Sequence, residues 1–109
     1  MPKYMFNASY TTDGVQGLLS GGGSARVAAA QSAMESVGGT LEAFYFTFGE
    51  NDAVIIADFP SNADAAAVSL AVSASGMVSG AMTVLLTPEE IDAAAATVSG
   101  AITYNPPGN

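Results

Sequence analysis

The sequence predicts a single α+β domain of element order β-α-β-β-α-β, followed by one more helix. Three observations predict this class. Apolar and polar residues alternate in several short segments, an aromatic-rich pair of such segments is joined by a polar turn, and alanine-rich segments between strands carry helix start and stop signals. We expect residues 1–104 to form the domain and residues 105–109 to be a C-terminal tail.

The first part of the chain predicts one strand and two helical segments. Tyr4–Tyr10 alternates, with its aromatic side chains on one side, which is typical of a half-buried strand. A threonine at 11 or 12 then caps a short helical turn. Gly21–Gly23 breaks this turn, and Ser24 caps a longer helix that runs through Val37. Gly38 ends that helix in the left-handed conformation that glycine adopts cheaply.

A hairpin is predicted next, from Thr40–Phe48 and Asp52–Phe59 with polar turn residues between them. If Phe48 pairs with Ala53, alternation divides the hairpin between two faces. The first face carries Phe44, Phe46, Phe48, Ile55 and Ala57, and the second carries Ala43, Tyr45, Thr47, Val54, Ile56 and Asp58. We expect the aromatic first face to lie under the helices.

The last part of the chain predicts two helices and a strand. Ser61, with an acidic residue three positions on, starts an alanine-rich helix that extends to about Ser75. Val78–Leu86 is the fourth strand. Thr87–Glu90 combines a cap, a proline at the first helical position and acidic residues, and so starts a helix that ends at Gly100. We expect Ala101–Tyr104 to add a short edge strand.

This order is that of the ferredoxin-like fold. Two right-handed βαβ crossovers place both main helices on one face of a four-stranded antiparallel sheet. The opposite face is then left open, and Val54 and Ile56 on that face suit an interface better than water.

The composition excludes several classes of protein. The chain has ten acidic and two basic residues, a net charge of −8, and no histidine or cysteine. Ser-His-Asp and Cys-His nucleophiles, zinc clusters and disulfides are therefore excluded. Lys3 and Arg26 alone cannot neutralise a run of phosphates, so we expect no nucleic-acid partner.

No membrane partner, metal or other cofactor is expected. The longest strongly apolar stretch, Ala53–Ala57, is too short to cross a bilayer, and no basic amphipathic segment is present. Glu50, Asn51 and Asp52 at the hairpin tip offer too few oxygens to fill a calcium or magnesium site. A cytoplasmic location is the default expectation.

The low charge predicts self-association. Charged residues are 11% of the chain, against about 25% in an average soluble protein. A small domain normally covers its surface with charge, so we expect this one to bury surface in a homodimer or higher homo-oligomer. The alternative is that alanine, serine and threonine simply form a mildly polar surface.

Several segments resemble the GYD-domain family, small bacterial proteins close to the dimeric α/β-barrel group. They are Gly22–Arg26, Glu35–Gly39, Leu41–Phe46, Phe48–Glu50 and Leu85–Glu90. The resemblance runs from about Pro2 to Ala95 and implies a fold and a dimeric assembly, but no particular activity. At the place of the Gly-Tyr-Asp element that names the family, Gly49–Asp52 has Asn51 where the tyrosine is expected.

The open sheet face is the candidate site. Its predicted polar residues are Asn7, Ser9, Tyr45, Thr47, Asp58, Ser79 and Thr83. Two such faces that meet in a dimer would enclose an apolar cavity with a few polar groups, which is typical of a pocket for a small apolar or aromatic ligand. The alternative is a solvated antiparallel sheet, which also alternates polar residues.

Tyr45 and Asp58 are the candidate catalytic residues. An enclosed carboxylate can act as a general base, and a phenol can donate a hydrogen bond to a developing enolate. Asp58 lies near Pro60, so the alternative is that it only ties down a turn. Two functions remain open: a small-molecule-binding protein that includes the possibility of a cofactor-independent enzyme, and a non-catalytic assembly module.

Arg26 is a separate candidate for ligand binding. It follows the Gly21–Gly23 loop in the first turn of a predicted helix, where its guanidinium and free backbone N–H groups can hold a carboxylate or phosphate. The alternative is an ion pair with Glu35, Glu42 or Asp52, in the same or a neighbouring subunit.

Overall fold

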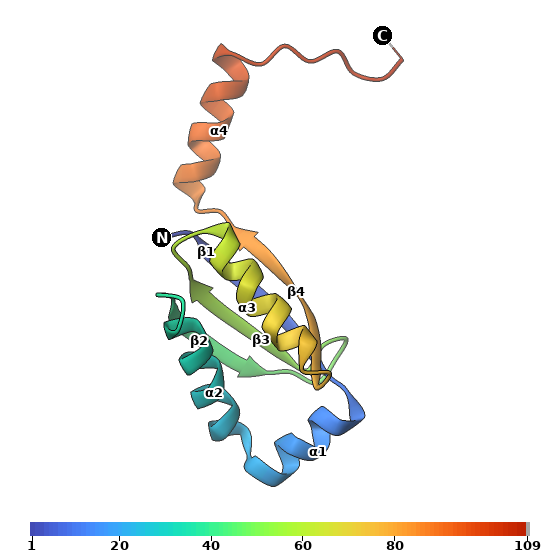
Figure 1. The fold of residues 1–109 in the computed structure, drawn as a ribbon. Coiled ribbons are helices and arrows are strands. Elements are labelled where there is room, and N and C mark those ends of the chain that lie inside the picture. The colour runs from blue at the N-terminus through green and yellow to red at the C-terminus, as the bar shows by residue number, and fades with distance from the viewer. Residues whose placement is uncertain (109) are drawn as a thin grey trace.

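The computed structural model describes residues 1–108, so Asn109 of the predicted tail lies outside it. The elements in chain order are β1 (Lys3–Tyr10), α1 (Thr12–Gly21), α2 (Gly23–Glu35), β2 (Thr40–Phe46), β3 (Ala53–Asp58), α3 (Asn62–Ala74), β4 (Val78–Leu85) and α4 (Pro88–Gly100). The strands form one four-stranded sheet of order β2-β3-β1-β4, with all neighbours antiparallel. Helices α2 and α3 cover one face of it (Figure 1). The predicted α+β, ferredoxin-like arrangement is confirmed.

The core lies between the sheet and these two helices. Alternate residues of β1 and β3 point into it, together with residues of α2 and α3. Its buried members are Tyr4, Phe6, Ala8, Met34, Ala53, Ile55, Ala57, Phe59, Ala65, Val68 and Val78. Phe59 is fully covered, and its ring meets the Tyr4 ring edge-on at a centroid distance of 5.5 Å.

The junction between α1 and α2 differs from the prediction. The break is one residue, Gly22, whose φ is +84° and whose N–H donates to the Leu18 oxygen at 2.7 Å. Helix α2 therefore starts at Gly23, without a side-chain cap, and Ser24 lies inside it. Glycine adopts this backbone conformation without strain, so a hydroxyl cap is not needed to end one helix and begin the next. Gly38 has a φ of +81°, as predicted.

The hairpin register is two residues away from the prediction. Phe46, not Phe48, pairs with Ala53. The N–H of Thr47 donates to the Asp52 oxygen at 2.8 Å, so the loop closes earlier and Phe48 lies fully exposed in it. A shift of two residues keeps the side chains within β2 and β3 on their predicted faces, because the side-chain period of a strand is two. The prediction that Phe48 lies under the helices is wrong, because the strand ends at Phe46.

Helix α4 projects away from the sheet (Figure 1). It begins with the predicted capping box between Thr87 and Glu90 but has no buried residue. The Cα radius of gyration is 17.4 Å, whereas a compact chain of this length has about 13 Å. The predicted edge strand at Ala101–Tyr104 is wrong, because α4 carries these residues away from every strand that they could pair with. Within residues 1–108, no helix is long and apolar enough to cross a membrane.

Candidate functional site

The open face of the sheet is the face opposite α2 and α3. Residues that pair across neighbouring strands project to the same side, so the register shows which side chains lie together. Three rows cross this face: Thr40–Asp58–Lys3–Leu85, then Ala43–Ile56–Met5–Thr83, then Tyr45–Val54–Asn7–Ala81. Ser9 and Ser79 pair beyond the third row. The sheet thus places Asn7, Tyr45, Asp58, Ser79 and Thr83 on one face.

The middle of this face is apolar. Met5, Val54 and Ile56 lie side by side on β1 and β3, and each is partly exposed although it is flanked by strands. Tyr45, on the edge strand β2, is 68% exposed. We refer to Met5, Tyr45, Val54 and Ile56 as the apolar band. No helix within residues 1–108 covers it.

One end of the open face carries an ion cluster. Lys3 Nζ lies 3.1 Å from Oδ1 of Asp58 and 3.0 Å from Oε2 of Glu42. A β-bulge between Leu41 and Ala43 brings Glu42 into reach. Hydrogen bonds from Lys3 to Glu42 and then to Asp58 raise the pKa of Lys3 above its ordinary value. Asp58 is therefore held by Lys3, which is not among the predicted site residues. Its position at the start of β1, the strand that pairs with β3, could have indicated this contact.

At the other end of the face, polar side chains hold the hairpin loop. Ser9 Oγ donates to Oδ1 of Asn51 at 3.3 Å, and Thr47 Oγ1 donates to the Asn51 backbone oxygen at 2.6 Å. The N–H of Tyr10 donates to Oδ2 of Asp52 at 2.8 Å. Ser9 and Thr47 are thus engaged with the loop.

Tyr45 and Asp58 do not form a close pair. Tyr45 pairs with Val54, and Asp58 lies four residues further along β3, which corresponds to about 13 Å of strand. A ligand would have to span the apolar band to touch both groups.

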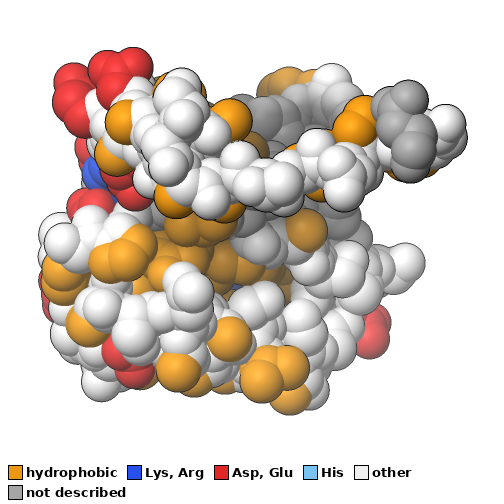
Figure 2. Space-filling view, turned by 90° about the horizontal axis from the view of Figure 1, so that it is seen from above, with side chains coloured by type: hydrophobic (Ala, Val, Ile, Leu, Met, Phe, Trp, Pro, Cys, Tyr) orange, Lys and Arg blue, Asp and Glu red, His pale blue; other side chains and the backbone are white. Residues whose placement is uncertain are grey.

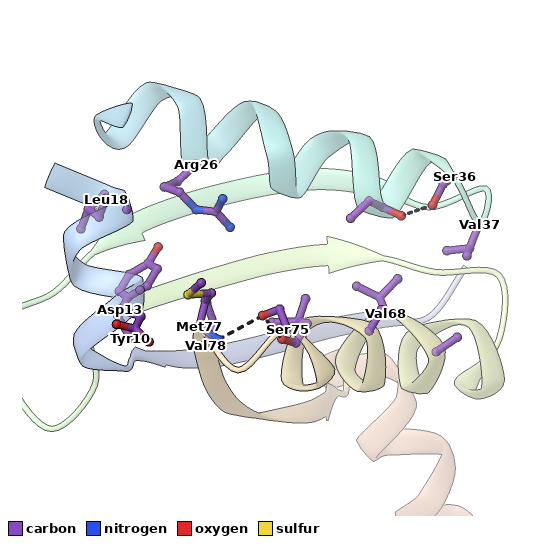
Figure 3. A pocket seen from close by; sticks show the side chains of 16 residues that line it. Tyr10, Asp13, Leu18, Arg26, Ser36, Val37, Val68, Ser75, Met77 and Val78 are labelled. Atoms are coloured by element: carbon purple, nitrogen blue, oxygen red, sulfur yellow. Dashed lines mark hydrogen bonds between the residues drawn. The ribbon is translucent and has the colours of Figure 1, made fainter. Parts of the chain in front are cut away.

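A groove lies on the opposite, helix-covered side (Figure 3). It runs between α2 and α3, has a volume of about 550 Å³ and adjoins a smaller hollow of about 130 Å³ above the sheet. It is lined by Tyr10, Asp13, Gly14, Gly17, Leu18, Arg26, Ala33, Ser36, Val37, Ala67, Val68, Ala71, Val72, Ser75, Met77 and Val78. The helix residues that line it include several alanines, which are too short to fill the space between two helices.

Arg26 lines this groove, so it is separated by the sheet from the other predicted site residues. Among residues 1–108, Lys3 forms ion pairs and Arg26 forms none. Its three predicted partners are engaged elsewhere: Glu35 with Gln31 at 3.2 Å, Glu42 with Lys3 at 3.0 Å, and Asp52 with the Tyr10 N–H at 2.8 Å. The predicted intrachain ion pair is therefore not formed.

The family model of the GYD domain matches residues 4–95. The chain belongs to the GYD-domain family. The match spans all four strands, α1 to α3 and the first part of α4, and confirms the resemblance seen in the sequence. No curated protein and no solved structure matches this GYD-domain chain.

Proposed function

We propose that this GYD-domain protein is a small-molecule-binding homo-oligomer that assembles through its open sheet face. The observation that carries the proposal is the apolar band, which none of the chain's own described helices covers. A sheet face that is adapted to water alternates polar residues with those of the core, whereas Met5, Val54 and Ile56 place apolar side chains on the water side. A second copy would shield them.

The surface composition supports this assembly. Figure 2 shows hydrophobic side chains gathered in a central hollow and in scattered patches around it, with few charged groups among them. Helix α4 adds to the uncovered apolar surface, because Ile91 and Val98 are 51% and 62% exposed. Burial of such surface between copies stabilises an oligomer by roughly 25 cal/mol per Å² before the cost of association.

The proposed pocket lies between two open faces that meet. The apolar band supplies its walls, and Tyr45, Asn7 and Thr83 supply its hydrogen-bonding groups. This lining suits a small apolar or aromatic molecule that carries one or two polar groups. Lys3 positions Asp58 at the rim, where the carboxylate can accept a hydrogen bond from a ligand.

The second candidate function is a non-catalytic assembly module. It is favoured by the separation of Tyr45 from Asp58 and by the ion pairs that engage Asp58. In this case, the apolar bands pack flush against each other and leave no cavity.

Sedimentation velocity and native mass spectrometry test the proposal. We expect the wild type to be at least dimeric, Ile56→Asp to be monomeric, and the control Leu70→Asp to stay oligomeric, because Leu70 is 72% exposed on α3, on the other side of the sheet. Circular dichroism verifies that the variants fold. Bound small-molecule mass that Tyr45→Phe weakens supports the pocket, and its absence from every preparation favours the assembly module. A wild type that is monomeric at all concentrations overturns both functions.

A further inference from the structure

We propose that the groove between α2 and α3 binds a small amphipathic carboxylate, with its alkyl or aryl part along the groove and its carboxylate on Arg26. This site is in a single copy of the chain and on the opposite side of the sheet from the proposed oligomer interface. Failure of either proposal therefore leaves the other one intact.

The groove has the size and lining of a ligand site. Small-molecule pockets are typically ~300–1,000 Å³ and largely apolar, with a few polar groups that orient the ligand. This groove has about 550 Å³. Ala33 on α2 faces it from one wall, and Ala67 and Ala71 on α3 from the other, so the chain itself leaves the space unfilled.

The charged groups of the lining and Tyr10 gather at one end, whereas Ser36 lies at the other. Arg26 points from α2 into the space, and Tyr10 and Asp13 lie across the groove from it (Figure 3). A guanidinium is charged at every physiological pH and presents a planar fork that matches a carboxylate. Tyr10 can donate a second hydrogen bond from its hydroxyl, which makes no hydrogen bond to another residue within 1–108.

The missing partner of Arg26 indicates the charge of the ligand. A partly buried guanidinium that lines an apolar groove is stabilised by an anion, yet the chain's ten acidic residues leave Arg26 without an ion pair within residues 1–108. The uncapped start of α2, three residues before Arg26, adds positive potential at the same end. Asp13 opposite and the net charge of −8 disfavour a ligand with several negative charges. A monocarboxylate with an apolar body satisfies these conditions.

Binding of octanoate, compared with the neutral 1-octanol, tests the proposal by ¹⁵N–¹H NMR titration of the full chain. We expect octanoate to shift amides of α2 and α3 that border the groove and to bind about tenfold or more tightly than 1-octanol. Equal affinity for the two probes, no shifts, or shifts confined to the open sheet face would overturn the proposal. A groove that is filled by a helix of a second copy would also show no octanoate binding.

Two matched variants separate charge from packing. Arg26→Met keeps the length of the side chain and should lower octanoate affinity about tenfold, to that of 1-octanol. The affinity for 1-octanol should stay unchanged. Lys3→Met removes the other cation, on the far side of the sheet, and should leave octanoate binding unchanged. The proposal fails if Arg26→Met binds octanoate as the wild type does, or if the two variants lose affinity equally.

Three further variants test the shape of the groove, the guanidinium fork and the need for a second copy. Ala71→Leu fills the groove and should abolish binding of both probes. If Arg26→Met does not fold, Arg26→Lys retains the charge but loses the fork, and we expect an affinity between those of the wild type and of 1-octanol. The Ile56→Asp monomer should bind octanoate like the wild type, and a loss there would show that the site needs a second copy.

Discussion

The two faces of the sheet have similar apolar side chains but different surroundings. Ile55 and Ile56 are consecutive on β3, yet Ile55 is 7% exposed under the helices, whereas Ile56 lies partly exposed on the open face. Both faces alternate as strands must, and only one is covered by α2 and α3. Strand periodicity therefore determines which residues share a face, while the packing of other elements determines what each face does.

The largest effect is expected at the centre of the covered face. Phe59→Ala removes a fully buried ring that packs edge-on against Tyr4. We expect it to lower the free energy of unfolding by about 3–5 kcal/mol, measured by urea denaturation. A loss below about 1 kcal/mol would show that the core beneath the helices is loosely packed.

Ile55→Ala and Ile56→Ala compare the two faces directly. Ile55→Ala should cost about 2–4 kcal/mol at every protein concentration, because its cavity lies within one copy. Ile56→Ala should cost about 1 kcal/mol in dilute protein, and more as the concentration rises and the wild type associates. Urea denaturation over a hundredfold range of concentration measures both. Equal and concentration-independent losses would contradict the proposed interface.

Gly80→Ala tests how closely the covered face is packed. A Cβ at Gly80 would lie 2.8 Å from Cζ of Phe6 and would also meet the backbone oxygen of Asn7. We expect a loss of about 1–3 kcal/mol in unfolding free energy. Its neighbour Ser79 is exposed on the open face, so Ser79→Ala serves as the control and should change the stability by less than about 0.5 kcal/mol.

The ion cluster on the open face should give a smaller, pH-dependent effect. The pKa of Lys3 is raised above its ordinary value of 10.5, so its stabilising contribution is present below that pH and is lost as the pH rises through the folded pKa. The wild type should therefore lose stability more steeply than Lys3→Met in alkaline solution. Urea midpoints of both proteins on either side of pH 10.5 measure this, and parallel pH profiles would contradict it.

The smallest effect is expected in α4, which covers neither face. Ala94→Pro breaks this helix, but α4 buries no residue, so the unfolding free energy of the sheet and its helices should change by less than about 0.5 kcal/mol in dilute protein. The matched control, Ala67→Pro in α3, should unfold the domain, because α3 packs on the sheet through Ala65 and Val68. Near-ultraviolet circular dichroism with urea denaturation distinguishes the two.

The parts of the fold that were predicted correctly depend mostly on strand alternation and helix caps, which involve residues close in the sequence. The alternation of β1, the cap of α3 at Ser61 and the capping box at Thr87 depend on residues that are close in the sequence, and all three are found. The hairpin register and the Lys3 cluster were not predicted correctly, because they depend on where the loop closes and on a bulge at Leu41/Ala43. The same holds for the candidate site. Alternation predicted that Tyr45 and Asp58 share a face, but it did not predict the distance between them.

Most helices and strands, the side chains that share a face and the excluded catalytic chemistries follow from local backbone preferences and from the residue types present. Which elements pack together depends on the tertiary fold. Helices α3 and α4 have the same length and comparable caps, yet α3 buries Ala65 and Val68 against the sheet, whereas α4 buries no residue within 1–108. Likewise, the groove at Arg26 exists because two alanine-lined helices straddle one face of the sheet. Contact between distant segments depends on the space that the whole fold leaves, which no local pattern records.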